Sequence, residues 1–162
     1  MTSIRAAVPD DAEVLARLNS IVQDLHRARR PDQFRSTAFD ELMRWYRSRL
    51  VDPSTQAWIA ENDSNPVGYA LAMLQRRPAT PFAPVRTWYE VDQIAVHPDH
   101  RRQGIGRSLM EVALAAASDL GVRNVEVSSW AFNEDMHHLL GNLGFAAKVL
   151  RFERGLPGEP SR

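Results

Sequence analysis

A turn rich in arginine and glycine is the part of the sequence best suited to bind a ligand. It runs from residue 96 to residue 106 as VHPDHRRQGIG, between a predicted strand and a predicted helix. The first N–H groups of a helix lack partners inside it and carry the positive end of its dipole, so they suit a phosphate. Gly104 and Gly106 have no side chain to hold a pyrophosphate away from the backbone. Positive charge comes from Arg101, Arg102 and Arg107.

The glycine spacing alone leaves two interpretations open. A helix start that needs flexible glycines explains it as well as a phosphate site does. The turn lacks the Gly-Lys-Ser/Thr of a Walker motif. It also lacks the third glycine of a dinucleotide-binding turn, because Leu109 stands at that position. More of the chain is needed to decide between the two interpretations.

The turn and its surroundings resemble the acetyl-CoA motif of the GNAT N-acetyltransferase superfamily. The likeness rests on Arg101-x-x-Gly104-x-Gly106, which starts five residues after the strand-ending Val96 and precedes an amphipathic helix. A second element lies at the expected distance. Residues 133–145, NEDMHHLLGNLGF, are similar to the Asn-led helix of the family that ends in Leu-Gly-Phe. Two elements in order favour the family more than either does alone.

The resemblance covers about residues 2–153 and is strongest from Glu90 to Phe145. Residues 67–70, VGYA, are similar to the start of the third strand in the family. The resemblance implies acetyl-CoA as co-substrate, with backbone groups of Ile94, Ala95 and Val96 pairing with its pantetheine arm like an added strand. The pyrophosphate would be held by Arg101, Arg102, Gln103, Gly104, Ile105, Gly106 and Arg107, and Asn133 would contact the cofactor from the next helix.

Two carboxylates precede the turn and are candidates for a catalytic base. Amine acetylation needs a neutral amine, and a positioned base can take its proton directly or through water. Glu90 stands fourteen residues before Gly104, where some members of the family place their catalytic glutamate. Asp92 shares its face if the strand is regular, whereas a bulge would change that parity. We therefore prefer Glu90 as the base over Asp92, although either carboxylate could be only an exposed strand residue.

The sequence departs from the family pattern at Leu140. Many members carry a tyrosine there that protonates the departing CoA thiolate, which leucine cannot do. His137 lies near the same helix face and is an alternative acid, although solvent exposure is the more frequent role of such a histidine. A thiol of pKa about 8.5 can also leave as the anion with help from donors and water. The departure weakens the assignment of an acid more than it weakens the family resemblance.

Hydrophobic periodicity predicts a mixed α/β domain. The expected strands are 4–8, 56–61, 67–75, 85–96, 125–130 and 145–153, and the expected helices are 10–25, 37–50, 105–120 and 133–144. The resemblance implies a GNAT-like α+β fold, in which about four helices flank a central mixed, mostly antiparallel sheet of about six to seven strands. We expect one domain over residues 1–154 and a disordered tail over residues 155–162.

Composition narrows the classes of function. Twenty Lys and Arg balance twenty Asp and Glu, so the net charge is zero, which argues against wholesale binding to nucleic acid or an anionic membrane. No cysteine is present, which excludes disulfides and thiolate nucleophiles. The five histidines form no His-x-x-x-His pair, so we expect no metal. The first residues, MTSIRAAVPDD, lack an apolar signal core and no apolar run reaches about 20 residues, so we expect a cytoplasmic protein.

The sequence predicts an acetyl-CoA-dependent N-acetyltransferase that acts on a primary amine of an unidentified small molecule, peptide or protein. The resemblance places the acceptor near the first two helices, with residues 26–34 as a lid. Candidate pocket aromatics are Phe34, Trp45, Tyr46, Trp88, Tyr89 and Trp130. One alternative is a non-catalytic acyl-CoA-binding or sensing module, and another is an interaction domain whose Arg101-Arg102 pair contacts nucleic acid. From the resemblance alone we also expect a homodimer.

Overall fold

The computed structural model describes residues 1–156, which form two compact units. The first unit is Met1–Ser128, and the second begins at Ser129 and contains the helix α4 (Glu134–Asn142). A single domain over residues 1–154 stays a prediction, and the expected tail falls largely on residues 157–162, outside the described residues.

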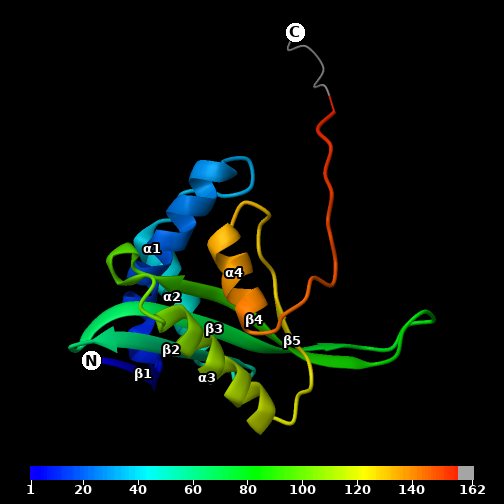
Figure 1. Cartoon of the computed structure of the whole chain (residues 1–162), viewed down its shortest axis with the longest axis horizontal. Coiled ribbons are helices and arrows are strands. Elements are labelled where there is room, and N and C mark those ends of the chain that lie inside the picture. Colours follow the sequence, from blue (N-terminus) through cyan, green and yellow to red (C-terminus); the bar gives the residue numbers. More distant parts are fainter. Residues whose placement is uncertain (157–162) are drawn as a thin grey trace. The chain divides into compact units, whose positions relative to one another are not determined.

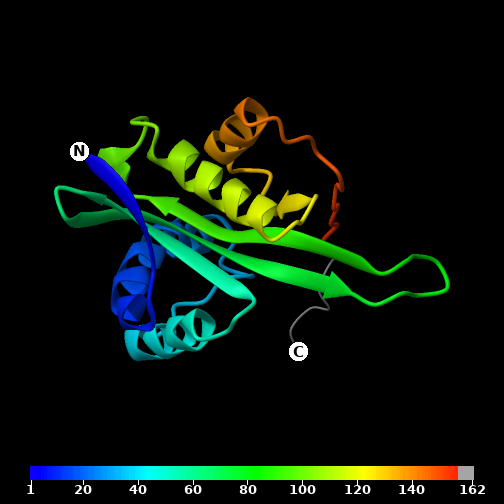
Figure 2. The ribbon, with the colours of Figure 1, turned by 90° about the horizontal axis from the view of Figure 1, so that it is seen from below.

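The first unit is built on one mixed sheet of five strands in the order β1-β2-β3-β4-β5 (Figures 1 and 2). Neighbouring strands are antiparallel except β4 and β5, which are parallel. The strands are β1 (Thr2–Ala6), β2 (Thr55–Asn62), β3 (Asn65–Arg77), β4 (Arg86–Val96) and β5 (Val125–Val127). The α+β fold is confirmed, with a mixed, mostly antiparallel sheet and four helices in the described residues, but the sheet has five strands rather than six or seven.

Three helices of the first unit cover the two faces of this sheet. Helices α1 (Ala12–Arg29) and α2 (Phe39–Leu50) lie on one face and α3 (Ile105–Asp119) lies on the other (Figure 2). The α1–α2 side holds a buried cluster: Ala12, Leu15, Ala16, Leu18, Tyr46, Ala57, Ile59, Tyr69, Leu71 and Ala95. The buried residues of α3 are Ile105, Leu109, Met110, Ala113 and Ala117. Successive side chains of a strand point to opposite faces of the sheet. Each β4 side chain therefore points either to α1 and α2 or to α3.

The β3–β4 pair is the longest in the sheet, and a glycine permits its close approach. Gly68 lies opposite Val96, and a Cβ atom at Gly68 would stand 2.8 Å from the carbonyl oxygen of Ala95. The pairing shifts register between Leu71 and Ala72, which is a β-bulge. The β2–β3 hairpin turns through Asp63 and Ser64, both with positive φ, as tight hairpin turns require.

The structure corrects two expectations about the elements. Helix α1 continues through residues 26–29, because arginine and alanine favour a helix even where the apolar pattern stops, and Pro31 follows its end. Residues 145–153 are not a strand, since they pair with no neighbour in the described part of the chain. Val149, Leu150 and Phe152 there are 76%, 73% and 86% exposed.

Candidate functional site

One edge of β4 is open where the strand approaches the arginine-rich turn. Within the described residues β4 pairs with β5 only from Tyr89 to Val91. The N–H of His97 donates to the Val67 carbonyl at 2.7 Å, so the backbone groups of His97 and Ala95 point to β3. The alternation of an antiparallel strand then directs the backbone groups of Ile94 and Val96 to the open edge. That edge can accept an extended chain through backbone hydrogen bonds.

The bulge decides which β4 side chains share a face. Leu71 lies opposite Gln93, and Ala72 lies opposite Val91, so Asp92 has no partner in the register. Glu90 lies opposite Met73, two residues along β3 from Leu71. Glu90 and Gln93 therefore share the face that is covered by α1 and α2.

The two carboxylates predicted as the base differ in their surroundings. Glu90 is half-buried and lies beside Glu126 of β5 in the parallel register. Asp92 is exposed as a residue, but nearby protein atoms remove enough water from its carboxyl group to raise its pKa. The Gln93 amide and the Arg49 guanidinium act in the opposite direction on that pKa. A raised pKa brings Asp92 nearer the range that suits a general base.

The turn after β4 delivers the start of α3. A short 3-10 turn spans Pro98–His100, and Gly104 caps α3 with φ of 81°, in the left-handed region. The first bond inside the helix runs from the Ser108 N–H to the Gly104 carbonyl at 2.9 Å. The N–H groups of residues 105–107 therefore have no carbonyl partner inside the helix. A Cβ atom on Gly104 would meet no described atom within 4 Å, so there is room for a ligand at this point.

The polar side chains of the turn are held by local contacts. The Arg101 Nε atom donates to the Val96 carbonyl at 3.3 Å, and the Gln103 amide donates to the Asp99 carbonyl at 3.4 Å. Arg107 pairs with Glu111 at 2.8 Å, and an exposed ion pair of this kind contributes little to the free energy of folding. Arg102 is exposed with φ of 58°. Ile105 is buried in the core, so only its backbone is available to a ligand.

The second unit carries the predicted Asn-led helix. The Asn133 side chain accepts a hydrogen bond from the Met136 N–H at 3.4 Å and so caps α4. The helix ends where the sequence predicted, with Gly144 at φ of 82° and the Phe145 N–H bonded to the Leu140 carbonyl at 2.9 Å. Leu140 is half-buried, and His137 is exposed.

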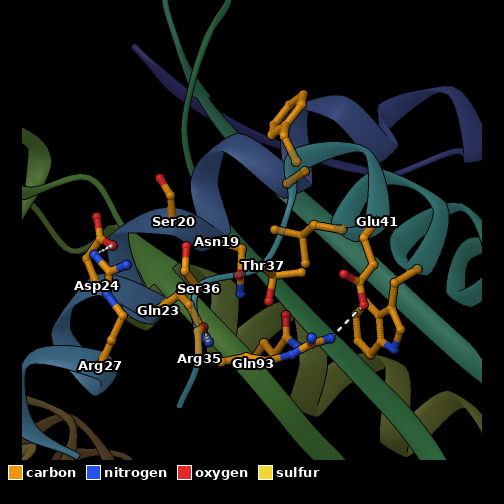
Figure 3. A pocket seen from close by; sticks show the side chains of 14 residues that line it. Asn19, Ser20, Gln23, Asp24, Arg27, Arg35, Ser36, Thr37, Glu41 and Gln93 are labelled. Atoms are coloured by element: carbon orange, nitrogen blue, oxygen red, sulfur yellow. Dashed lines mark hydrogen bonds and ion pairs between the residues drawn. The ribbon is translucent and has the colours of Figure 1, made fainter. Parts of the chain in front are cut away.

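A pocket of about 380 Å³ lies between α1, α2 and the segment that joins them (Figure 3). It is lined by Ala16, Asn19, Ser20, Gln23, Asp24, Arg27, Arg35, Ser36, Thr37, Phe39, Glu41, Leu42, Trp45 and Gln93. The joining segment contributes through residues 35–37, whereas Arg27 is the one lining residue of the predicted lid 26–34. Trp45 is the one predicted aromatic in the lining. The polar lining of α1 was not predicted, although Asn19, Ser20 and Gln23 follow helical spacing and mark one face of that helix in the sequence.

A hydrogen-bonded network holds Gln93, the one lining residue from β4. Its Oε1 atom accepts from the hydroxyl groups of Tyr46 at 2.6 Å and Tyr69 at 2.9 Å. Asn19 donates to the Tyr69 hydroxyl at 3.0 Å. Burial raises the pKa of Tyr69 to about 12 and raises that of Tyr46 as well, so both hydroxyls are neutral at neutral pH. Two hydroxyl groups occupy Oε1, and the amide group of Gln93 forms a hydrogen bond with Asp92 that lowers the pKa of that carboxyl group.

Residues 1–156 hold no group of three or more His, Cys, Asp and Glu side chains placed to bind a metal ion. No helix among them is both long enough and apolar enough to cross a membrane.

Comparison with known proteins gives one family and many similar folds. The model of the acetyltransferase (GNAT) family matches residues 18–145. No curated protein sequence matches the chain. The tetramutant of the BH1408 protein from Bacillus halodurans has a similar structure, with a TM-score of 0.88 at 22% identity over 95% of this chain and 99% of that one.

Two named enzymes also share the fold. An aminoglycoside N-acetyltransferase in complex with CoA has a TM-score of 0.76 at 18% identity, over 96% of this chain and 95% of that one. A ribosomal-protein-alanine N-acetyltransferase from Brucella melitensis biovar Abortus has a TM-score of 0.71 at 22% identity, over 96% and 99%.

Proposed function

Because the chain belongs to the acetyltransferase (GNAT) family, we propose that this N-acetyltransferase moves an acetyl group from acetyl-CoA to a primary amine. The observation that carries the proposal is the continuity of two binding features. The open edge of β4 at Ile94 and Val96 runs directly into the turn where Gly104 starts α3. An edge strand suits the amide-containing arm of CoA, and a helix start suits its pyrophosphate.

The other turn residues support this binding in different ways. In the proposal the N–H groups of Ile105, Gly106 and Arg107 face the pyrophosphate, and the guanidinium groups of Arg101 and Arg102 add positive charge. Ala95 and Gln103 hold the strand and the turn in place. Asn133 contributes from α4, on the strength of the family resemblance.

In the proposed reaction the neutral amine nitrogen attacks the thioester carbonyl. A C–N bond forms, the C–S bond breaks, and the nitrogen gives up one proton. Glu90 takes that proton, directly or through a water molecule. It lies on the same face of β4 as Gln93, and Gln93 lines the pocket between α1 and α2, where we place the acceptor. Asp92 is the alternative base, supported by its raised pKa. The CoA sulfur leaves as the thiolate and gains a proton from water or from His137, since Leu140 cannot supply one.

Release of free thiol from acetyl-CoA with a panel of amines tests the proposal. We expect amine-dependent thiol release and an acetylated amine that contains one new amide bond. A chain that binds acetyl-CoA but releases no thiol with any amine would instead be the non-catalytic acyl-CoA-binding module. The proposal also includes a cytoplasmic location and assembly as a homodimer.

A further inference from the structure

The charges at the pocket between α1 and α2 are balanced, which bears on the acceptor. Asp24 pairs with Arg27 at 3.3 Å, and Glu41 pairs with Arg35 at 2.7 Å. The two pairs lie apart in the pocket (Figure 3). The lining residues thus carry two negative and two positive charges. A ligand of one sign would meet as many like charges as opposite ones.

Both ion pairs can exchange partners with a ligand. The Asp24 side chain is 69% exposed and that of Arg35 is 75% exposed. Exposed pairs of this kind contribute at most about 1 kcal/mol, because water screens them. A ligand with an ammonium and a carboxylate can therefore exchange partners with one of these pairs, its ammonium bonding to the acid and its carboxylate to the arginine. Both members of that pair then keep a neighbour of opposite charge, and the other pair is undisturbed.

The neutral groups of the pocket favour a ligand that also accepts hydrogen bonds. Gln93 lies at the floor, where two tyrosine hydroxyls hold its oxygen and Asp92 accepts from its amide group. The Ser20 hydroxyl donates to the Arg17 carbonyl at 2.7 Å, whereas Ser36 and Thr37 add hydroxyl groups to the lining. These donors and the two arginines suit the oxygen atoms of a carboxylate.

One part of the lining is apolar and aromatic. Phe39, Leu42 and Trp45 of α2 form this part of the pocket. The Arg49 guanidinium stands 5.2 Å from the centre of the Trp45 ring, which holds the ring from one side. A side chain of the ligand can pack on this surface and leave water.

We propose that the acceptor is a zwitterionic amine, an amino acid or short peptide that carries a free carboxylate and an apolar side chain. This inference rests on the proposed function, since it names the substrate class of the same site. The ammonium lies toward Asp24 or Glu41 before it loses its proton, and the carboxylate lies toward the arginine of that pair. The volume of about 380 Å³ is sufficient for a ligand of this size.

A matched series of acceptors tests the inference. Thiol release is measured with phenylalanine, phenylalanine amide, 2-phenylethylamine and spermine as acceptors. The amide replaces the carboxylate of phenylalanine with a neutral group and also lowers the pKa of its amine, so the two acceptors are compared per fraction of neutral amine. We expect kcat/KM for phenylalanine to exceed that for the amide by about 10-fold or more, with spermine poorest. A preference for spermine or for the amide overturns the inference and leaves the proposed function intact.

Three arginine variants locate the effect. Arg35→Gln should remove most of the preference for phenylalanine over its amide, because the carboxylate loses a partner. Arg17→Gln is the control, since Arg17 pairs with Glu13 on α1 and does not line the pocket. A preference that survives in Arg35→Gln and in Arg27→Gln overturns the inference.

Calorimetry separates failure of the inference from failure of the proposed function. Binding of phenylalanine and its amide is measured in the presence of CoA. If no acceptor releases thiol but phenylalanine still binds more tightly than its amide, the proposed function fails and the inference about the ligand stands. If neither compound binds and neither reacts, the inference is overturned.

Discussion

Two glycines with the same backbone conformation stand at opposite ends of α3, and only one of them lies at the proposed pyrophosphate site. Gly104 has φ of 81° before the helix, and Gly121 has φ of 70° after it. A Cβ atom at either position meets no described atom within 4 Å. A side chain at either glycine therefore imposes a similar backbone strain of about 1–2 kcal/mol. Any difference between the two variants must come from what occupies the space beside Gly104.

Gly104→Val should weaken acetyl-CoA binding by about 10-fold or more, because the side chain enters the space proposed for the pyrophosphate. Gly121→Val should lower stability to a similar extent and leave the affinity unchanged. Calorimetry with acetyl-CoA on both folded variants measures the difference. Equal affinity in the two variants would place the cofactor elsewhere.

Glu90→Gln should lower the rate of acetylation by about 10²-fold, which is the usual scale of general-base catalysis. The loss should shrink at high pH, where the amine arrives already deprotonated. Asp92→Asn is the matched variant and should cost less. Rates across pH with the true acceptor decide the assignment. A larger loss in Asp92→Asn would transfer the role to Asp92, in agreement with its raised pKa.

At the scale of elements, the β3–β4 pair both builds the sheet and presents the site. Gly68 allows β4 to lie close to β3. The bulge at Asp92 changes which β4 side chains point to each face of the sheet, and the strand then ends at the arginine-rich turn. The resemblance of residues 67–70 to a strand start marked this position in the sequence. The bulge could not be predicted, because nothing in the alternation of residues 88–96 marks where one strand gains a residue over its neighbour.

Gly68→Ala should destabilise the protein by about 1–3 kcal/mol, because its Cβ would stand 2.8 Å from the Ala95 carbonyl oxygen, which is backbone and cannot swing away. Gly141→Ala in α4 is the control, since a Cβ there meets nothing within 4 Å and alanine favours a helix. Urea unfolding of both variants measures the change. Equal stability of Gly68→Ala and the parent would show that β4 shifts at no cost.

The tyrosine network at the floor of the pocket predicts a loss of stability in alkali. The pKa of Tyr69 is about 12 in the folded chain and about 10 when unfolded. Its contribution is therefore fully present below about pH 10 and is lost as pH rises through about 12. Tyr69→Phe should be less stable at pH 8, because Asn19 loses its partner, but should lose less stability between pH 8 and 11. A pH dependence equal to that of the parent would contradict the raised pKa.

At the scale of the whole molecule, the sequence predicted best what depends on short-range pattern. The helical spacing of Ile105, Leu109 and Ala113 predicted α3, and the helix starts directly after Gly104, as the two glycines of the turn indicated. The pocket could not be predicted in detail, because Asn19, Glu41 and Gln93 come from three elements that only the tertiary fold brings together. The strand expected over residues 145–153 failed for a similar reason, since a strand needs a partner that its own sequence does not specify.

The exposed apolar side chains of that same segment bear on assembly. Val149, Leu150 and Phe152 expose most of their surface, which monomeric proteins seldom allow in a cluster. We expect a second copy of the chain to cover them, as the family resemblance also led us to expect. Light scattering at micromolar concentration should then give twice the chain mass of 18.3 kDa. Phe152→Asp should shift the mass toward that of one chain, because a charge at a buried contact is costly, whereas Phe82→Asp at the exposed hairpin tip should not. A mass of one chain for the parent protein would refute the homodimer.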